Sequence, residues 1–379
     1  MSGEVICAPY ETYTALRFSF TLFGTVIATL GLPANLLLVY VFATRKCSST
    51  PPTLYPSAIA ILDAVICLAY VLIFGIDAII IFAKNESLFV LYYLYIIPAY
   101  VASRIAQLAI PYMLIFATLE RFVWITAGKT RSRFLQRMYS KSGRQLTLFI
   151  SLAVCVALRL PLFWAVTVED YPKCPIFLRS KLTNPADWTL EDTWLATAHY
   201  FSDYYLLSFG QSLVPFLILL VLNGVIVCKL YEDQTKDEQK QQFCKSTLNT
   251  LAVTYGDYGT ELHAGSRSPS FAALFPALKT NSVQVRSAMY TMLAIVTSYL
   301  ISTGLHLILT VLERSGSPLI SDSEDPEQFS LFHTAFSDVV TFVIMLSSAI
   351  RIVIYYVCNP KTRDDLRVVL LRKDSIEYV

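Results

Sequence analysis

Hydrophobic residues along this chain gather into seven long stretches, and polar segments separate one stretch from the next. About 20 apolar residues form a helix that crosses the hydrocarbon core of a bilayer. Backbone polar groups must bond within such a segment, which favours helices over open strands. The alternating ten-residue pattern of a membrane β-barrel is missing from the sequence. We therefore expect an all-α membrane protein, a seven-transmembrane-helix bundle with spans at Phe18–Ala43, Leu54–Ala83, Tyr92–Ile125, Gln145–Val168, Thr197–Leu230, Val283–Leu312 and Phe329–Cys358.

Lysine and arginine are concentrated on one side of these predicted spans, which sets the orientation because basic loops stay in the cytoplasm. The basic side holds Arg45, Lys46, Lys129, Arg131, Arg133, Arg137, Lys141, Arg144, Lys236, Lys240, Lys245, Lys279, Arg286, Lys361, Arg363, Arg367, Arg372 and Lys373. The other side holds only Arg17, Lys84, Lys173, Arg179, Lys181 and Arg314. We expect a multi-pass protein of the plasma membrane with its N-terminus outside.

The same pattern divides the chain into three parts. We expect an extracellular N-terminus at 1–17, a transmembrane domain at 18–358 and an amphipathic helix with a cytoplasmic tail at 359–379. A cytoplasmic loop at 231–282 is polar and then rich in glycine and serine, as mobile loops are. The segment that starts at Lys361 places its apolar and basic residues on opposite faces of a helix, which is typical of a helix lying on membrane lipid.

Composition supports the membrane environment and offers no catalytic centre. The 379 residues are 55% hydrophobic and only 15% charged, and a soluble domain is usually about a quarter charged. The formal charge of +2 gives no indication of nucleic-acid binding. The four histidines are scattered, no two cysteines are spaced as Cys-x-x-Cys, and no phosphate-binding glycine loop occurs. We expect no enzyme activity, no metal and no cofactor.

The predicted outer side carries a candidate disulfide and a candidate glycosylation site. Among the eight cysteines, only Cys7 and Cys174 fall on the predicted outer side, where oxidising conditions favour a disulfide between them. The alternative is two separate cysteines. Asn85-Glu86-Ser87 is a glycosylation sequon in a predicted outer loop, so Asn85 is a candidate glycan acceptor.

The motif that indicates function stands at the inner end of the third span, where the sequence reads Glu120-Arg121-Phe122. It resembles the Glu/Asp-Arg-Tyr signature of rhodopsin-like G-protein-coupled receptors, with Phe122 in place of tyrosine. Supporting resemblances lie in other spans at Asn35, Asp63, Pro215 and Ser347–Tyr355. The resemblance implies that Glu120 holds Arg121 at rest, and that Arg121 enters a cytoplasmic cavity when the helices separate. The alternative is that Arg121 is an ordinary interfacial arginine whose side chain extends to the headgroups.

The sixth and seventh spans resemble those of invertebrate FMRFamide-like neuropeptide receptors. That resemblance implies an amidated peptide ligand and a heterotrimeric G protein, with arrestin as a further partner. Three departures from the family pattern remain. The outer end of the third span has no cysteine, the sixth span has neither Trp nor Pro, and Arg351-Ile352 replaces the Asn-Pro of the seventh. A chemosensory receptor for a small molecule is the alternative, and a transporter or channel is a third reading from another class.

For a receptor we expect a ligand cavity between the outer halves of the helices. An Arg-Phe-amide peptide carries a cation, which favours a carboxylate in a poorly solvated site. We expect Asp338, Asp77 and Asp203, in that order, to provide it, while Arg104 binds a carbonyl or an acidic group. The complete predicted lining is Asp77, Ser103, Arg104, Gln107, Asp203, Tyr204, His306 and Asp338.

Arg351 lies within the seventh span and needs a partner, because a lone arginine in a membrane core costs at least about 2.5–3.5 kcal/mol. In rhodopsin-like receptors the matching position faces the position of Asp63, and a sodium ion commonly sits between them. We expect an Asp63–Arg351 salt bridge that replaces the ion, with Asn35 and Ser347 or Ser348 nearby. The alternative is that Arg351 extends to the inner headgroups. Together with Glu120, Arg121, Phe122 and Tyr355, this pair forms the predicted activation machinery.

Overall fold

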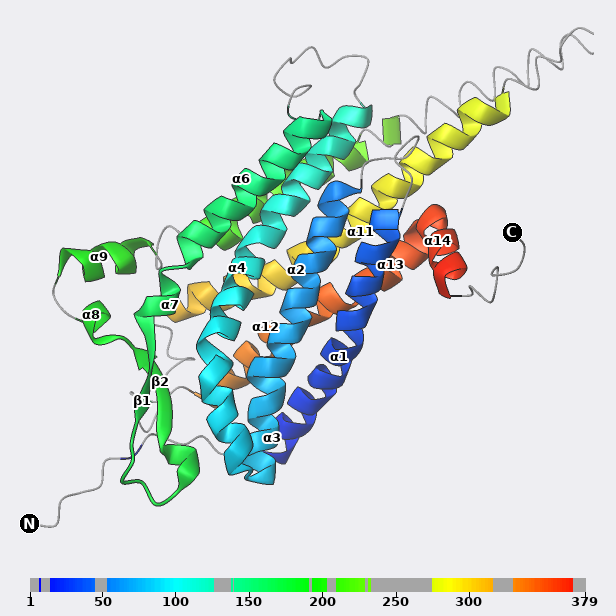
Figure 1. Cartoon of the computed structure of the whole chain (residues 1–379). Helices are drawn as coiled ribbons and strands as arrows, with labels where there is room; N and C mark the ends of the chain where they lie inside the picture. The colour runs from blue at the N-terminus through cyan, green and yellow to red at the C-terminus, as the bar shows by residue number, and fades with distance from the viewer. Residues whose placement is uncertain are drawn as a thin grey trace, which may run out of the picture.

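The computed structural model describes residues 7, 14–44, 53–125, 138, 140–190, 193–202, 209–228, 231–232, 275–315 and 330–370. Within these ranges, seven helices are long and apolar enough to cross a membrane. The helices lie side by side in one bundle, as Figure 1 shows. The predicted seven-helix membrane fold is therefore confirmed.

The first three spans begin close to the predicted positions. Helix α1 runs from Ala15 to Thr44. The second span is α2 (Leu54–Tyr70), a π-helical turn (Val71–Gly75) and α3 (Ile76–Ala83). Helix α4 covers Glu86–Ile125 and starts six residues before the predicted Tyr92. The reason is a polar cap, since the Asn85 side-chain oxygen accepts a hydrogen bond from the Leu88 N–H at 3.0 Å.

The prediction was wrong at the end of the fourth span, and the start of the fifth span stays a prediction. Helix α6 (Lys141–Arg159) and the short α7 (Leu162–Ala165) end before Val166, which opens a β-strand rather than continuing the span to Val168. Residues 194–201 form helix α9 (Trp194–Phe201), residues 203–208 lie outside the described residues, and the fifth membrane-length helix is described from Gly210 to Cys228. Average hydrophobicity does not distinguish the apolar start of this strand from the span before it.

The last two spans and the tail helix complete the bundle. Helix α11 covers Phe275–Arg314, so it begins eight residues before the predicted Val283. The seventh span is divided into α12 (Leu331–Ala349) and α13 (Arg351–Cys358). Helix α14 (Pro360–Leu370) follows directly and confirms the predicted short helix after the seventh span. Most of the predicted loop 231–282 lies outside the described residues.

A β-hairpin at one end of the bundle was not predicted. Strands β1 (Val166–Asp170) and β2 (Lys181–Pro185) pair antiparallel, with a 3₁₀ turn (Phe177–Arg179) between them and the short helix α8 (Asp187–Leu190) after them. The Tyr93 hydroxyl of α4 donates to the Lys181 carbonyl at 3.0 Å. Figure 1 shows the hairpin beside the end of the bundle that is remote from α14.

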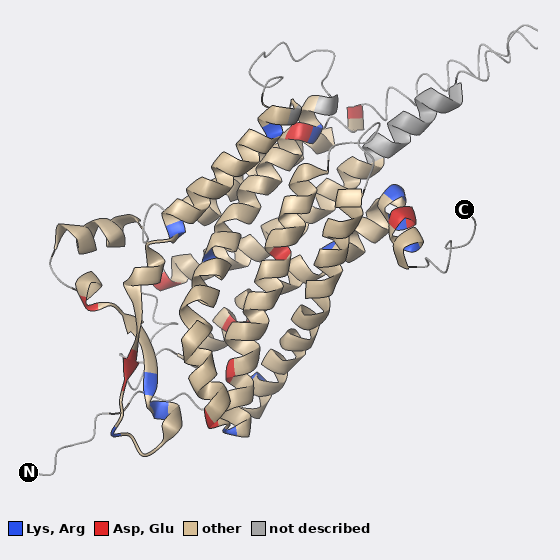
Figure 2. Cartoon of the chain, viewed as in Figure 1, with Lys and Arg blue, Asp and Glu red and all other residues tan. Residues whose placement is uncertain are grey.

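The bundle is held by an apolar core and carries its charge mainly at its ends. Helix α1 packs on α2 and α12, α2 packs on α4, and α11 packs on α12 and α13. Leu38, Ile59, Met113, Leu114 and Ile295 are almost completely buried in this core. Figure 2 shows the charged residues mainly near the helix ends and in the hairpin, with few in the middle of the bundle. Burial of an ionised side chain in a membrane is costly. The few charged groups inside the bundle are therefore candidates for functional residues.

Candidate functional site

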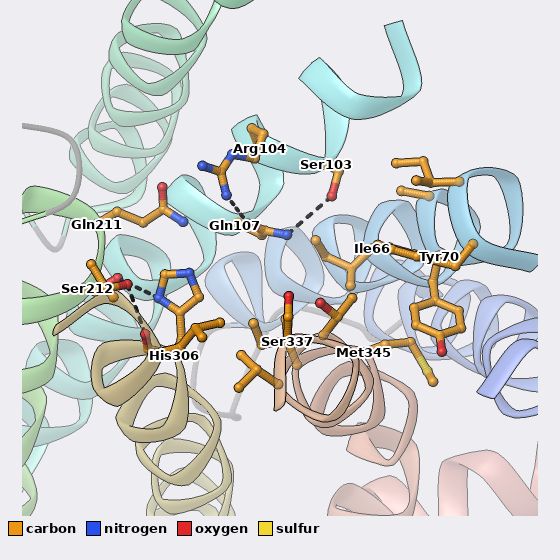
Figure 3. Close-up of a pocket in the computed structure, with 18 of the residues that line it drawn as sticks. Ile66, Tyr70, Ser103, Arg104, Gln107, Gln211, Ser212, His306, Ser337 and Met345 are labelled. Atoms are coloured by element: carbon orange, nitrogen blue, oxygen red, sulfur yellow. Dashed lines mark hydrogen bonds between the residues drawn. The ribbon is translucent and has the colours of Figure 1, made fainter. Parts of the chain in front are cut away.

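A cavity of about 360 Å³ opens between the helices in the half of the bundle that carries the hairpin. Figure 3 shows that its walls come from several different helices. Its polar lining consists of Ser103, Arg104, Gln107, Arg159, Gln211, Ser212, His306, Thr310, Glu313, Ser337 and Thr341. Its apolar lining includes Ile66, Tyr70, Phe74, Leu309 and Met345. A concave site with an apolar wall and a few convergent polar groups is the usual form of a ligand pocket.

One wall of the cavity is shaped by the π-helical turn at Val71–Gly75. A π turn shifts the hydrogen-bond register of a helix and leaves carbonyl groups for other donors. Two tyrosines of α4 bond these carbonyls, since the Tyr95 hydroxyl donates to Leu72 at 3.2 Å and the Tyr92 hydroxyl donates to Ile73 at 3.3 Å. The third span thus holds the second one at the edge of the cavity.

The opposite wall repeats this arrangement at Phe209–Leu213, which is also a π-helical turn. The Tyr112 hydroxyl of α4 donates to the Gly210 carbonyl at 2.7 Å. The turn brings Gln211 and Ser212 to the cavity, and both side chains are buried. These two lining residues were missed because the sequence pattern of a π turn does not differ from that of a regular helix.

Polar side chains of α4 form a short chain of contacts along the cavity. Arg104 Nη1 lies 3.4 Å from Gln107 Oε1, and Gln107 Nε2 donates to the Ser103 hydroxyl at 3.3 Å. Figure 3 shows these three side chains together, with Gln107 between the other two. All three were predicted as lining residues of the third span, and all three line the cavity.

A second set of contacts joins the fourth, fifth and sixth spans. Arg159 of α6 donates to the side-chain oxygen of Gln211, and the Ser212 hydroxyl lies 3.3 Å from His306 Nδ1. His306 was predicted to line the cavity and does so. Arg159 was missed because it lies near the outer end of its span, where an arginine is an ordinary interfacial residue.

Four other predicted lining residues are placed differently or fall outside the description. Asp338 contacts Arg17 of α1, with 2.7 Å between its Oδ2 and the Arg17 Nε. The described cavity lining includes neither Asp338 nor Asp77. Asp203 and Tyr204 lie outside the described residues. No three His, Cys, Asp or Glu side chains in the described part of the chain gather into a group that could hold a metal ion.

A smaller cavity of about 40 Å³ continues from the first one toward the middle of the bundle. Gln107, Gln211, Ser212 and His306 line both cavities, while Arg351 lines only the smaller one. The polar groups around the larger cavity therefore extend to the buried charges of the seventh span.

Those buried charges form the predicted salt bridge. Arg351 Nη1 lies 3.0 Å from Asp63 Oδ2, and the two side chains are only 1% and 0% exposed. Asn35 stands beside them and donates through Nδ2 to the carbonyls of Gly31 at 3.0 Å and Ser348 at 3.1 Å. The contact confirms the predicted pairing, and its role in activation stays a prediction.

The position of Arg351 depends on an interruption of the seventh span. Ile350 has φ −78° and ψ −1°, and it separates α12 from α13 although the sequence has no proline there. The Val353 N–H donates to the Ile350 carbonyl at 2.9 Å, which is a tighter turn than that of an α-helix. Arg351 is therefore the first residue of α13 and faces the interior of the bundle.

At the other end of α4, the Glu120 carboxylate is 1% exposed and lies 2.9 Å from Arg144 Nη1 of α6. This ion pair joins α4 to α6 and was not predicted; the expected interaction of Glu120 with Arg121 stays a prediction. Arg121 is half-buried, and Phe122 packs against Ile226 and Met289. Tyr355 is buried with its ring edge against Phe42. The basic residues Lys129, Arg131 and Arg133 lie outside the described residues.

The predicted covalent link at the hairpin end is present. Cys7 and Cys174 form a disulfide with their Cα atoms 5.6 Å apart. It ties the segment that precedes α1 to the loop between β1 and β2. Asn85 is exposed, and its glycosylation stays a prediction.

Comparison with known proteins places the fold. The sequence matches no protein-family model and no curated protein sequence. The structure is similar to the crystal structure of squid rhodopsin, with a TM-score of 0.58 over 99% of this chain and 94% of that chain, at 13% sequence identity. At that identity the likeness shows the fold, which is the seven-helix fold of rhodopsin.

Proposed function

We propose that the chain is a G-protein-coupled receptor of the plasma membrane, with its N-terminus outside and a heterotrimeric G protein bound at the inner ends of its helices. The observation that carries this proposal is the inner end of α4. There the Glu120-Arg121-Phe122 motif lies within a rhodopsin fold, and the Glu120 carboxylate is buried in an ion pair across two helices. An ion pair between helices that separate on activation holds a resting state, because its rupture leaves a buried charge.

We propose an amidated, FMRFamide-like neuropeptide as the ligand. Support comes from the resemblance of the last two spans to those of invertebrate FMRFamide-like neuropeptide receptors. The cavity volume, about 360 Å³, lies near the lower end of the range for ligand pockets, so it accommodates the end of a peptide rather than a whole one. Arrestin at the inner face and membrane lipid beneath α14 are the further partners that this reading implies.

A chemosensory receptor for small molecules is the second candidate, and the small volume of the cavity favours it. A transporter is less well supported, because Met113, Leu114 and Ile295 pack tightly in the described core beyond the small cavity. A transport path needs an opening on alternate sides of its central site.

The test is nucleotide exchange on a panel of purified G proteins, with the full chain in lipid nanodiscs. Pools of amidated peptides and of volatile odorants are supplied separately. We expect peptide-dependent exchange by the wild type and none by an equal amount of folded Arg121→Ala. Exchange driven only by odorants would establish the second candidate. Wild-type exchange by Arg121→Ala would contradict the receptor mechanism.

A further inference from the structure

The charged groups that line the larger cavity have a positive balance. Within the described lining, the ionised side chains are Arg104, Arg159 and Glu313. Glu313 lies near the end of α11, is 43% exposed, and has its Oε1 2.9 Å from His333 Nε2. The carboxylate of this lining is thus at the rim and already in contact with a histidine.

Arg104 has the strongest remaining capacity to bind an anion. Its contact with Gln107 Oε1 is long, at 3.4 Å, and its Nε is buried without a hydrogen-bond acceptor among the described residues. The guanidinium carbon lies 5.7 Å from the centre of the Tyr100 ring. An amide oxygen and an aromatic ring use few of the five donors of a guanidinium. Figure 3 shows this group beside Gln107, on the side of the cavity that Gln211 faces.

The physical chemistry of the site favours a carboxylate as the missing partner. A cation within a membrane protein is stabilised by an opposite charge far more than by neutral dipoles. The planar fork of arginine matches the two oxygens of a carboxylate and binds both. Beside this polar end, Ile66, Phe74, Leu309 and Met345 supply an apolar wall. The site is therefore complementary to a molecule with an acidic end and an apolar body.

We propose that the ligand of this cavity presents a carboxylate to Arg104. This inference rests on the proposed receptor function and names the chemical class of its ligand. The carboxylate belongs either to a small amphipathic acid or to a peptide, as an acidic side chain or a free C-terminus. This carboxylate–Arg104 contact replaces the expected contact between an Arg-Phe-amide cation and Asp338. Asp338 contacts Arg17, and the described lining does not include it.

The test compares 4-phenylbutyrate with its neutral amide as probes of the purified full-length receptor in nanodiscs. Thermal stability is measured over a titration of each probe. We expect the carboxylate to bind at least about ten times more tightly than the amide. Arg104→Gln should abolish this preference and Arg104→Lys should keep part of it. Arg179→Gln, the same change in the hairpin outside the cavity, should leave it intact.

Two results would overturn the inference. One is equal binding of acid and amide by the wild type, which is decisive even if Arg104→Gln fails to fold. The other is a preference that survives in folded Arg104→Gln. Since these titrations use no G protein, failure of nucleotide exchange would remove the proposed function while leaving the anion site established.

The exchange assay distinguishes a carboxylate carried by a peptide from one carried by a small molecule. Peptides are supplied as matched free-acid and amide forms, alongside a series of aliphatic and phenyl-substituted carboxylic acids. Activity of free-acid or acidic peptides places the carboxylate on a peptide, and activity of the simple acids places it on a small molecule. Activity confined to amidated peptides without acidic residues would contradict the inference.

Discussion

Arg351 Nη1 lies 3.0 Å from the Asp63 carboxylate in the middle of the bundle, and both side chains are almost fully enclosed. The pair joins the second span to the beginning of α13, at the interruption of the seventh span. The attraction of Arg351 is the main compensation of the buried Asp63 carboxylate, and the Ser348 side chain adds a weaker one. A pair with so little additional hydrogen bonding is sensitive to the loss of either partner.

The first prediction concerns this pair. Asp63→Asn or Arg351→Ala alone should each lower stability by about 3–5 kcal/mol, because each leaves an uncompensated buried charge. The double change Asp63→Asn with Arg351→Ala should cost less than the sum of the two. Urea or thermal unfolding of the four proteins in nanodiscs gives this coupling energy. Additive losses would show that the two charges do not stabilise each other.

The second prediction follows from the charge that Arg351 brings. A guanidinium beside Asp63 occupies the place where a sodium ion would be attracted, and like charges repel. Replacement of sodium chloride by choline chloride at equal ionic strength should therefore leave the melting temperature of the wild type unchanged. Arg351→Ala should acquire a sodium dependence if it folds. A clear stabilisation of the wild type by sodium would contradict this account.

The third prediction concerns the resting state. Arg144→Ala and Glu120→Gln should both raise ligand-independent nucleotide exchange, because each breaks the 2.9 Å ion pair between α6 and α4. Arg367→Ala is the matched control, since Arg367 is an exposed arginine of α14. Its basal exchange should equal that of the wild type. Unchanged basal exchange in Arg144→Ala would mean that this pair has only a structural role.

The sequence predicted the parts of this fold that depend on average hydrophobicity and on isolated chemistry. The seven spans follow from the apolar length that a bilayer requires, and the Asp63–Arg351 contact follows from the cost of a lone charge in a membrane. The disulfide follows from the small number of outward cysteines. Each of these inferences rests on a single strong physical constraint.

The rest depends on local geometry that composition does not encode. The two π turns bring Gln211, Ser212 and Phe74 to the cavity, and a shift of one residue per turn leaves hydrophobic periodicity nearly unaltered. The partner of Glu120 was missed because α6 is remote from it in sequence. Asp338 was expected in the cavity, but its carboxylate contacts Arg17 of α1, a pairing between distant segments that the sequence pattern does not reveal.

The fourth prediction tests that last contact. If Asp338 serves mainly to join α12 to α1, Asp338→Asn and Arg17→Gln should lower the melting temperature by similar amounts, and the double variant should lose little more. The pair is partly exposed, with side chains 21% and 23% accessible, so the effect should be about 1 kcal/mol or less. Ligand potency should change equally in both variants. A large loss of potency in Asp338→Asn alone would return Asp338 to the ligand site.

The fifth prediction concerns the close approach of α1 to the interruption of the seventh span. A Cβ atom at Gly31 would lie 2.8 Å from the Ala349 Cβ and 3.0 Å from the Cys67 sulfur. Real Cβ atoms do not approach so closely, so Gly31→Ala should displace α1 from α12 at the point where Asn35 bonds the Ser348 carbonyl. Such overpacking usually costs about 1–3 kcal/mol.

Gly224 supplies the matched control, because a Cβ there meets no atom within 4 Å. Alanine is a better helix former than glycine by about 1 kcal/mol, so Gly224→Ala should be neutral or slightly stabilising, and the same local gain applies at Gly31. The difference between the two melting temperatures thus isolates the packing cost. Adding Ala349→Gly to Gly31→Ala removes the closer of the two clashes and should recover part of the loss. If Gly31→Ala melts as high as Gly224→Ala, the helices are not packed as closely as described, and the Asn35 bridge to the seventh span would have to be abandoned with them.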